Sequence, residues 1–168
     1  MTRILFVCLG NTCRSPMAEF LMKDLAAKAD LSEHFQIESA GTYAAGGPVN
    51  PPAEQKLAGH GISCAGKISR QLVKAGYDRF GLIIGMDNLN LVTMQDLFDN
   101  DPEGKLHRLL DYTGDRRNIE DPWYTRDYET AWQDRILRRD AGAVGDFTGR
   151  EERQMRCSGR PEGFVPRF

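Results

Sequence analysis

Apolar and polar positions along this chain follow two periods, one typical of buried strands and one typical of amphipathic helices. Short apolar runs, or alternation of apolar and polar residues, predict strands at residues 4–7, 35–39, 82–86 and 106–110. Helices are expected at residues 16–29, 51–58, 88–98 and 127–139, with a possible short helix at 70–74. Turn-forming residues such as Gly, Pro, Asn and Asp cluster between these segments.

The helical spacing also predicts which apolar side chains face the core. In the first helix these are Met17, Phe20, Leu21, Leu25 and Ala29. In the helix at residues 88–98 they are Leu89, Val92 and Leu97, and in the last helix they are Tyr128, Trp132 and Ile136. Each face is expected to be buried against the rest of the molecule.

Strands and helices alternate along the chain, and this order favours a parallel sheet with right-handed crossover connections. The expected fold class is therefore α/β, as a single three-layer domain with a four-stranded parallel sheet flanked by helices. A chain of 168 residues fits one such domain. The periodic pattern ends near residue 139, so the domain is assigned to residues 1–139. Residues 140–168 are expected to be an atypical Gly- and Arg-rich tail with little order.

The composition is that of an ordinary globular protein, with 40% hydrophobic and 27% charged residues. The net charge of −2 gives no general attraction to nucleic acid or to an anionic membrane, so neither partner is expected. No apolar run approaches the ~20 residues of a membrane span, and no signal-peptide core precedes the first strand, so the expected location is cytoplasmic. The cysteines have no zinc-site spacing, so neither a metal nor another cofactor is expected; they are Cys8, Cys13, Cys64 and Cys157.

The most distinctive stretch is Val7-Cys8-Leu9-Gly10-Asn11-Thr12-Cys13-Arg14-Ser15-Pro16, between the first strand and the first helix. Ser15 at the N-cap and Pro16 at the first helical position are typical of a helix start. The backbone N–H groups of such a turn point inward and cradle an anion, and Arg14 adds planar donors for two oxygens. Gly10 and Asn11 tolerate the backbone angles that a tight turn needs.

The position of Cys8 beside this turn indicates a chemical role for its thiol. A lone cysteine after a strand is usually a small buried hydrophobic residue, but beside an anion cradle and Arg14 it would be held as a thiolate, a nucleophile aimed at phosphorus. Because parallel strands end at one edge of a sheet, Ser39 and Asp87 should lie at the same edge. A loop pair as close as Cys8 and Cys13 could also form a reversible disulfide.

A thiolate that attacks a phosphate monoester expels an alkoxide or a phenolate, which needs a proton from a general acid. The candidates are acidic residues on loops, namely Asp87, Asp101, Asp111 and Asp121. Their positions in the sequence do not distinguish one of these four residues as the general acid. Asp121 has one advantage, because Trp123 and Tyr124 follow it and could flank an aromatic leaving group.

Residues 7–19 closely resemble the signature of the low-molecular-weight protein tyrosine phosphatases. Three later segments are similar to the family's other motifs, in the right order: Ser39-Ala40-Gly41-Thr42, Gly85-Met86-Asp87 and Asp121-Pro122-Trp123-Tyr124. The resemblance covers residues 1–138. It implies a metal-independent enzyme that hydrolyses phosphotyrosine and small aryl phosphates through a cysteinyl-phosphate intermediate. Its expected partners are phosphotyrosine-containing proteins, and its oligomeric state is left open.

The resemblance also implies residue roles. Cys8 would be the nucleophile, Arg14 would bind the phosphate, and Asp121 would act first as general acid and then as base. The phosphate-binding residues would be Leu9, Gly10, Asn11, Thr12, Cys13, Arg14 and Ser15. The hydrogen-bonded loop network would comprise Asn11, Ser15 and Ser39, and the aromatic substrate wall Trp123 and Tyr124. Cys13 resembles the family's second loop cysteine, which can trap Cys8 as a disulfide and makes the site redox-sensitive.

The chain also departs from the family pattern. Residues 66–71 lack the histidine that many members join to the loop network, so the network could be closed differently here. Residues 43–45 lack the tryptophan that some members place at the pocket mouth. Two alternatives stay open: arsenate reduction on the same fold, with only Cys64 and Cys157 as a further redox pair, and a non-catalytic phosphoprotein-binding or redox-sensing module.

Overall fold

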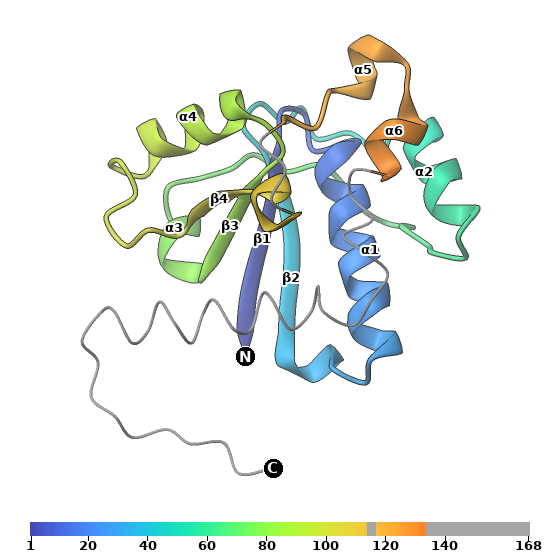
Figure 1. Cartoon of the computed structure of the whole chain (residues 1–168), viewed down its shortest axis with the longest axis horizontal. Helices are drawn as coiled ribbons and strands as arrows, with labels where there is room; N and C mark the ends of the chain where they lie inside the picture. The colour runs from blue at the N-terminus through green and yellow to red at the C-terminus, as the bar shows by residue number, and fades with distance from the viewer. Residues whose placement is uncertain (114–116, 134–168) are drawn as a thin grey trace.

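Four parallel strands form one sheet at the centre of the computed structural model, which describes residues 1–113 and 117–133 (Figure 1). They lie in the order β2-β1-β3-β4 and are β1 Thr2–Cys8, β2 Phe35–Gly41, β3 Leu82–Gly85 and β4 Leu106–Arg108. β1 pairs with β2 on one side and with β3 on the other. The chain that follows β1 therefore emerges in the middle of the sheet's carboxyl edge.

Helices cover both faces of this sheet (Figure 1). The α-helices are α1 Arg14–Lys28, α2 Pro51–Ala58, α3 Gly76–Arg79, α4 Asn88–Leu97, α5 Pro122–Thr125 and α6 Tyr128–Gln133. Two 3-10 segments are η1 Ser32–His34 and η2 Leu109–Thr113. Helices α3 and α4 lie on one face of the sheet and α1 on the other, with α2 and α6 packed outside α1.

The side chains of β1 alternate between two apolar clusters, as the two-fold period of a strand requires. Ile4, Phe6 and Cys8 join the cluster formed with α1, whereas Leu5 and Val7 join the cluster formed with α3 and α4. Each of these side chains is at most 3% exposed. A strand buried on both faces needs helices on both sides, so the expected three-layer α/β fold is confirmed.

A third cluster joins α1 to the helices outside it. Met17 on α1, Leu57 on α2 and Trp132 on α6 meet there. The His60 ring stacks on Trp132 with a centroid distance of 4.4 Å, and its Nδ1 lies 2.9 Å from the carbonyl oxygen of Lys56 at the end of α2. These contacts fix the chain after Asp121 to the body of the domain.

The start of α1 differs from the prediction. The helix begins at Arg14, with Cys13 as its N-cap residue, and no side chain caps this end. Ser15 was predicted as the N-cap, but its hydroxyl contacts Asn11 and the Cys8 sulfur in the preceding loop. The prediction was wrong because this hydroxyl has partners in the loop rather than at the helix end.

The buried face of α1 is also rotated from the predicted one. Met17 is buried, but Ala29 lies beyond the end of the helix and is exposed. Three of the predicted core residues are only partly buried: Phe20, Leu21 and Leu25. The residues that cover the sheet are instead Ala18, Met22 and Ala26. Small residues at two of these positions let the helix lie close to the strands.

Helix α4 packs through a different face from the one its apolar spacing predicted. Leu89 and Val92 are 65% and 53% exposed, and Leu97 is only partly buried. The helix instead buries Asn90 and Met94. Asp87 is the N-cap and accepts the Asn90 N–H at 2.7 Å, while the Asn90 side chain accepts a backbone N–H just after β3. Hydrogen bonds at the first turn of α4 therefore determine which face of the helix packs against the sheet.

Residues 70–74 form no helix, although the prediction allowed a short one; Gln71 instead forms a parallel bridge with Gly41, and Lys74 lies in a turn. Gly41 at the end of β2 donates its N–H to Arg70 at 2.9 Å, and its carbonyl accepts the Leu72 N–H at 2.7 Å. The outer edge of β2 has unpaired backbone groups at this point, and this segment satisfies them. The short helix α3 follows, at Gly76–Arg79.

The last part of the chain is described only in part. Tyr128 and Trp132 of α6 pack on α1 and α2 as predicted, but residues 134–139, including Ile136, and the predicted tail at 140–168 lie outside the described residues. β4 is shorter than predicted, because η2 begins at Leu109. Among the described residues, no helix has the length and apolar character needed to cross a membrane.

Gly41 is the point where β2 meets the loop that follows β1. A Cβ atom on Gly41 would lie 2.6 Å from the Leu9 carbonyl oxygen and 3.0 Å from the Asn11 nitrogen. Both neighbours are backbone atoms, which cannot rotate away as a side chain would. Only glycine therefore permits the loop to lie directly against the end of β2.

Replacing Gly41 with alanine is expected to lower the free energy of unfolding by about 1–3 kcal/mol, the usual cost of overpacking. Urea denaturation of the purified variants measures it. Gly47→Ala is the matched control, because a Cβ atom there would meet nothing within 4 Å. Equal unfolding midpoints for the two variants would contradict the close approach at Gly41.

Candidate active site

The carboxyl edge of the sheet brings together residues from three strands, as predicted. Cys8 ends β1, Ser39 lies near the end of β2, and Asp87 follows β3. Arg14, the first residue of α1, reaches Asp87 with its guanidinium. This is the edge at which parallel α/β sheets bind their ligands.

The backbone of the 8–15 loop is held from outside. The N–H groups of Thr42, Tyr43 and Asn50 donate to the carbonyls of Cys8, Leu9 and Thr12 at 2.9, 2.8 and 2.7 Å. Asn11 has a left-handed φ of 53°, whereas Gly10, also singled out from the sequence, does not. Because these three carbonyls are directed outward, the N–H groups that share their trans peptide planes, those of Leu9, Gly10 and Cys13, are directed to the opposite side, as in an anion-binding nest.

Side chains inside the loop form a chain of hydrogen bonds that ends at Cys8. Asn11 Nδ2 donates to Ser39 Oγ at 2.8 Å and to Ser15 Oγ at 2.9 Å. Ser15 Oγ lies 3.0 Å from Cys8 Sγ and 3.4 Å from the Ala40 carbonyl oxygen. The sulfur is therefore the nearer acceptor for the Ser15 proton, and a hydroxyl that donates to sulfur stabilises a thiolate.

The network closes without the histidine that is missing from residues 66–71. The backbone N–H of Arg70 donates to Asn11 Oδ1 at 3.0 Å and so fixes the orientation of this amide. At the other end, the Ser39 hydroxyl donates to the buried carboxylate of Glu19 at 2.6 Å. A backbone amide and a carboxylate therefore complete the network.

Arg14 is almost completely buried, with 2% of its surface exposed. Its NH1 donates to Asp87 Oδ2 at 2.5 Å and to the Ile119 carbonyl at 3.0 Å, and its NH2 donates to Asp121. Its Nε is buried and has no hydrogen-bond partner among the described residues. A buried N–H donor without a partner costs free energy, so this atom is suited to bind an anionic oxygen.

The charges around Arg14 outweigh the effect of its burial. Burial alone would lower the pKa of the guanidinium, but the Cys8 sulfur and the carboxylates of Asp121 and Asp87 raise it. Arg14 therefore stays charged, and the two carboxylates hold its plane in one orientation.

The structure reduces the four candidate general acids to two. Asp87 and Asp121 both contact Arg14, and each side chain is 18% exposed. Asp101 lies in the turn before β4, at the opposite edge of the sheet, where it accepts the N–H groups that start this strand. Asp111 is paired with Arg108. Asp101 and Asp111 are therefore occupied elsewhere.

Three exposed aromatic residues belong to segments at the same edge. Trp123 and Tyr124 on α5 are 57% and 74% exposed, and the Trp123 N–H donates to Asp121 Oδ1 at 3.1 Å. Tyr43, which is 79% exposed, follows β2 and is joined to the 8–15 loop by its N–H. Trp123 and Tyr124 were predicted as a wall, whereas Tyr43 was noted only for the absence of a tryptophan nearby.

The described cysteines are all buried thiols that form no disulfide with one another: Cys8, Cys13 and Cys64. Cys157 lies outside the described residues. Cys64 packs in the cluster of α1, α2 and α6, and burial, followed by the charge of Glu54, raises the pKa of its thiol. Within residues 1–113 and 117–133, no group of three or more His, Cys, Asp or Glu residues is arranged to hold a metal ion.

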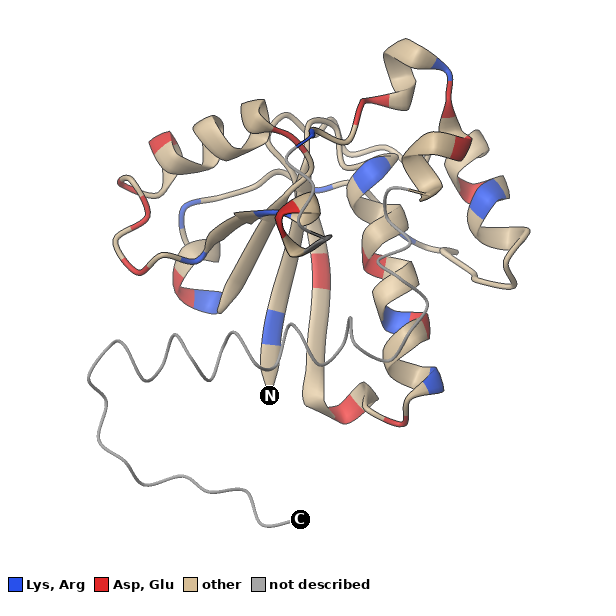
Figure 2. Cartoon of the chain, in the orientation of Figure 1, with Lys and Arg blue, Asp and Glu red and all other residues tan. Residues whose placement is uncertain are grey.

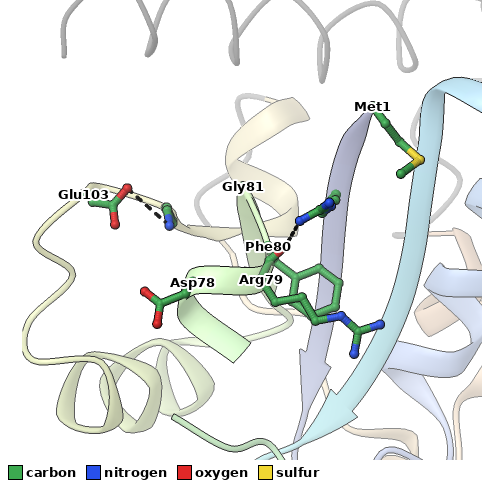
Figure 3. Close-up of a pocket in the computed structure, with 8 residues that line it drawn as sticks. Met1, Asp78, Arg79, Phe80, Gly81 and Glu103 are labelled. Carbon is green, nitrogen blue, oxygen red and sulfur yellow. Dashed lines mark hydrogen bonds and ion pairs between the residues drawn. The ribbon is translucent and has the colours of Figure 1, made fainter. Parts of the chain in front are cut away.

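A separate hollow of about 410 Å³ lies at the opposite edge of the sheet, where the strands begin (Figure 3). Arg3, Arg79 and Lys105 line it together with Asp78 and Glu103. Its basic groups already have partners: Arg3 donates to the Arg79 carbonyl, Lys105 pairs with Glu103, and Arg79 pairs with an acid outside the hollow. The reactive residues therefore lie at the Cys8 end of the sheet.

Sequence reasoning missed two contributors to the site, Glu19 and the backbone N–H of Arg70. The sequence did contain one indication that Glu19 belongs to the site. Glu19 lies four residues after Ser15, so the two side chains share a face of the helix. Nothing in the local sequence indicates the Arg70 contact, which joins residues 59 positions apart.

Comparison with known proteins shows a consistent likeness. A family model for low molecular weight phosphotyrosine protein phosphatase matches residues 3–138. The low molecular weight protein-tyrosine-phosphatase YfkJ of Bacillus subtilis is 38% identical over 137 residues, covering 79% of this chain and 88% of YfkJ. The human low molecular weight phosphotyrosine protein phosphatase is 34% identical over 137 residues, covering 77% and 86% of the two chains.

Solved structures agree with this likeness. The crystal structure of YfkJ matches with a TM-score of 0.76 at 34% identity, covering 94% of each chain. The YwlE arginine phosphatase, solved as a Cys-to-Ser variant with a phosphorylated active-site serine, matches with a TM-score of 0.71 at 26% identity, covering 92% of this chain and 96% of that one. The matched residues 3–138 contain every residue of the site described above.

Proposed function

Because the chain belongs to the low-molecular-weight phosphotyrosine protein phosphatase family, a family of hydrolases, we propose that it hydrolyses phosphotyrosine and small aryl phosphates through a cysteinyl-phosphate intermediate. The observation that carries the proposal is Arg14, which is 2% exposed, faces the charge of Cys8, and has an unpartnered Nε among the described residues. A buried cation and a nucleophilic sulfur side by side suit the binding and attack of a phosphate.

In the first step, the Cys8 thiolate attacks phosphorus, and the bond from phosphorus to the phenolic oxygen of the substrate breaks. The inward N–H groups of the 8–15 loop, from Leu9 to Ser15, and the guanidinium of Arg14 bind the non-bridging oxygens. The Ser15 hydroxyl, 3.0 Å from the sulfur, stabilises the thiolate before the attack and again when it is released. The YwlE variant with a phosphorylated active-site serine supports a covalent step of this kind.

Asp121 supplies the proton in the first step and recovers one in the second. As a carboxylic acid it protonates the departing phenolate. As a carboxylate it then takes a proton from water, which attacks phosphorus and breaks the sulfur–phosphorus bond to release phosphate and the Cys8 thiolate. Its contact with Arg14 supports this role, because it places the carboxyl group beside the phosphate-binding guanidinium.

The exposed aromatic side chains support an aryl phosphate as the substrate. Trp123 and Tyr124 lie two and three residues after Asp121, so a ring bound between them would bring its oxygen close to the acid. Phosphotyrosine-containing proteins are therefore the proposed partners. Phosphoarginine is the competing substrate class, because one structural neighbour is named an arginine phosphatase.

Neither step uses a metal ion, since Arg14 and the loop N–H groups supply the positive field that a metal would otherwise provide. We assign Cys13 a protective role. It follows Cys8 by five positions in the same loop. A peroxide that oxidised the Cys8 thiolate would convert it to a sulfenic acid. The Cys13 thiol would then attack the Cys8 sulfur, a disulfide would form, the sulfur–oxygen bond would break and water would be released; thiols can reduce this disulfide.

The test is turnover of a substrate panel in EDTA by the wild-type chain. p-Nitrophenyl phosphate should be hydrolysed at the same rate with and without EDTA, and vanadate should inhibit this hydrolysis. Among peptides, the phosphotyrosine form should be preferred to phosphoserine and phosphoarginine forms, because only its leaving group is an aromatic ring. Dependence on a metal, or preference for phosphoarginine, would refute the proposal as stated; absence of any turnover would indicate a binding module.

A further inference from the structure

We propose that Glu19 and Lys67 form a positioning pair that fixes the donor direction of the hydrogen-bond chain ending at Cys8. The inference rests on the proposed function, because the pair would keep Cys8 ready as the nucleophile. Neither residue was among the site residues predicted from the sequence, and both act through Ser39.

Glu19 lies one helical turn after Ser15 on α1, a helix that carries both acidic and basic residues (Figure 2), and its side chain is 5% exposed. Its Oε2 accepts from the Ser39 hydroxyl at 2.6 Å and from the Lys67 ammonium at 2.7 Å. Its Oε1 accepts from Lys23 at 2.5 Å. The Lys67 side chain is 11% exposed and that of Lys23 is 44% exposed, so Lys67 is the buried partner.

Two groups set the direction of this chain: the Glu19 carboxylate, which only accepts hydrogen bonds, and the backbone N–H of Arg70, which donates to Asn11 Oδ1. Ser39 gives its one hydroxyl proton to Glu19, and so its oxygen accepts from Asn11. The same Asn11 amide nitrogen donates to Ser15, whose own proton is left for Cys8 Sγ at 3.0 Å, a nearer partner than the Ala40 carbonyl oxygen at 3.4 Å. A fixed carboxylate at one end thus produces a fixed donor to the sulfur at the other.

The opposite direction would leave the sulfur without this donor. If Glu19 lost its charge, the Ser39 hydroxyl would be free to turn, and rotation of the Asn11 amide would be opposed by the Arg70 N–H without the help of Ser39. In the rotated amide, Oδ1 of Asn11 would face the Ser15 hydroxyl and draw its proton away from Cys8. The Glu19–Lys67 pair therefore disfavours the arrangement in which Ser15 donates to Asn11 and the Cys8 thiolate has no hydroxyl donor.

Glu19 remains ionised although it is buried. Burial alone would raise its pKa, but hydrogen bonds from Lys23, Lys67 and Ser39 outweigh burial and lower it. A carboxyl group with a lowered folded-state pKa stabilises the fold above its unfolded pKa, and loses this effect only as the pH falls through the folded value.

The test is the pH dependence of Cys8 alkylation by iodoacetamide in the full chain, followed on the Cys8 peptide by mass spectrometry. Lys67→Met keeps the length of the side chain and removes its charge. It should raise the pH midpoint of alkylation by about one unit, the scale of a lost hydrogen bond to the thiolate. The kcat for p-nitrophenyl phosphate should fall by up to about tenfold with little change in KM, and Lys67→Arg should restore both values.

Lys23→Met is the matched control, because it removes the same charge from the other oxygen of Glu19. The proposal predicts a clearly smaller shift for this variant, and equal shifts for Lys23→Met and Lys67→Met would overturn it. Glu19→Gln should shift the midpoint in the same direction as Lys67→Met, and unchanged midpoints for both would also overturn it. Alkylation requires no turnover, so failure of the proposed phosphatase function would appear separately, in the wild-type assay.

Discussion

Replacing Cys8 with serine is expected to lower kcat for p-nitrophenyl phosphate by a factor on the order of 10⁴–10⁶, the size of effect seen when a covalent nucleophile is removed. A serine hydroxyl stays protonated near neutral pH, and the contact from Ser15 cannot activate it. Steady-state kinetics measure the loss. Phosphate should still bind, because the loop N–H groups and Arg14 remain, and calorimetry with inorganic phosphate tests this.

Cys64→Ser provides the matched control for this variant. Cys64 is also buried, at 5% exposure, but it packs outside the 8–15 loop and its thiol has a raised pKa. Its replacement should leave kcat near the wild-type value. Full activity in Cys8→Ser, or equal losses in the two variants, would be incompatible with Cys8 as the nucleophile. A slow accumulation of phosphoserine in Cys8→Ser, detected by intact mass, would support the covalent step.

Replacing Asp121 with asparagine is expected to slow turnover by about 10²–10⁴-fold, the range for loss of a general acid. The loss in kcat/KM should be larger for phenyl phosphate than for p-nitrophenyl phosphate, because a poorer leaving group depends more on the proton. Comparison of kcat/KM for the two substrates measures this difference.

Asp87→Asn distinguishes proton donation from support of Arg14, because both carboxylates contact this guanidinium. Loss of the Asp87 carboxylate should lower kcat/KM by the same factor for both aryl phosphates, because it changes the orientation of Arg14 and not the supply of a proton. A dependence on the leaving group that appeared in Asp87→Asn, and not in Asp121→Asn, would reassign the acid to Asp87.

The parts of the site that depend on local sequence could be predicted. Cys8 and Arg14 are joined by one turn between a strand and a helix, and the alternation of elements placed that turn at the carboxyl edge of the sheet. Asp87 and Ser39 were located by the same rule. Spacing along the chain was enough in these cases because short-range backbone geometry determines where the residues lie.

The parts that depend on side-chain direction could not be predicted in the same way. Leu89 and Val92 have the spacing of a buried face, yet the Asp87 cap and the bonds of Asn90 turn that face outward. Glu19 lies in the segment that resembles the family signature but was assigned no role from the sequence, although its carboxylate accepts a hydrogen bond from Ser39. Hydrogen bonds between distant segments leave no periodic trace in a sequence.

The attachments of the 8–15 loop have a consequence for how the molecule opens. Its carbonyls and the Asn11 side chain are hydrogen-bonded to Thr42, Tyr43, Asn50 and Arg70. Thr42 and Tyr43 directly follow β2, and Arg70 accepts a hydrogen bond from Gly41 at the end of that strand. The loop cannot move away alone, so it shares one cooperative unit with the centre of the sheet. The conformational entropy of the loop is therefore lost when the chain folds, and in the proposed reaction a phosphate would bind to donors that are already in place.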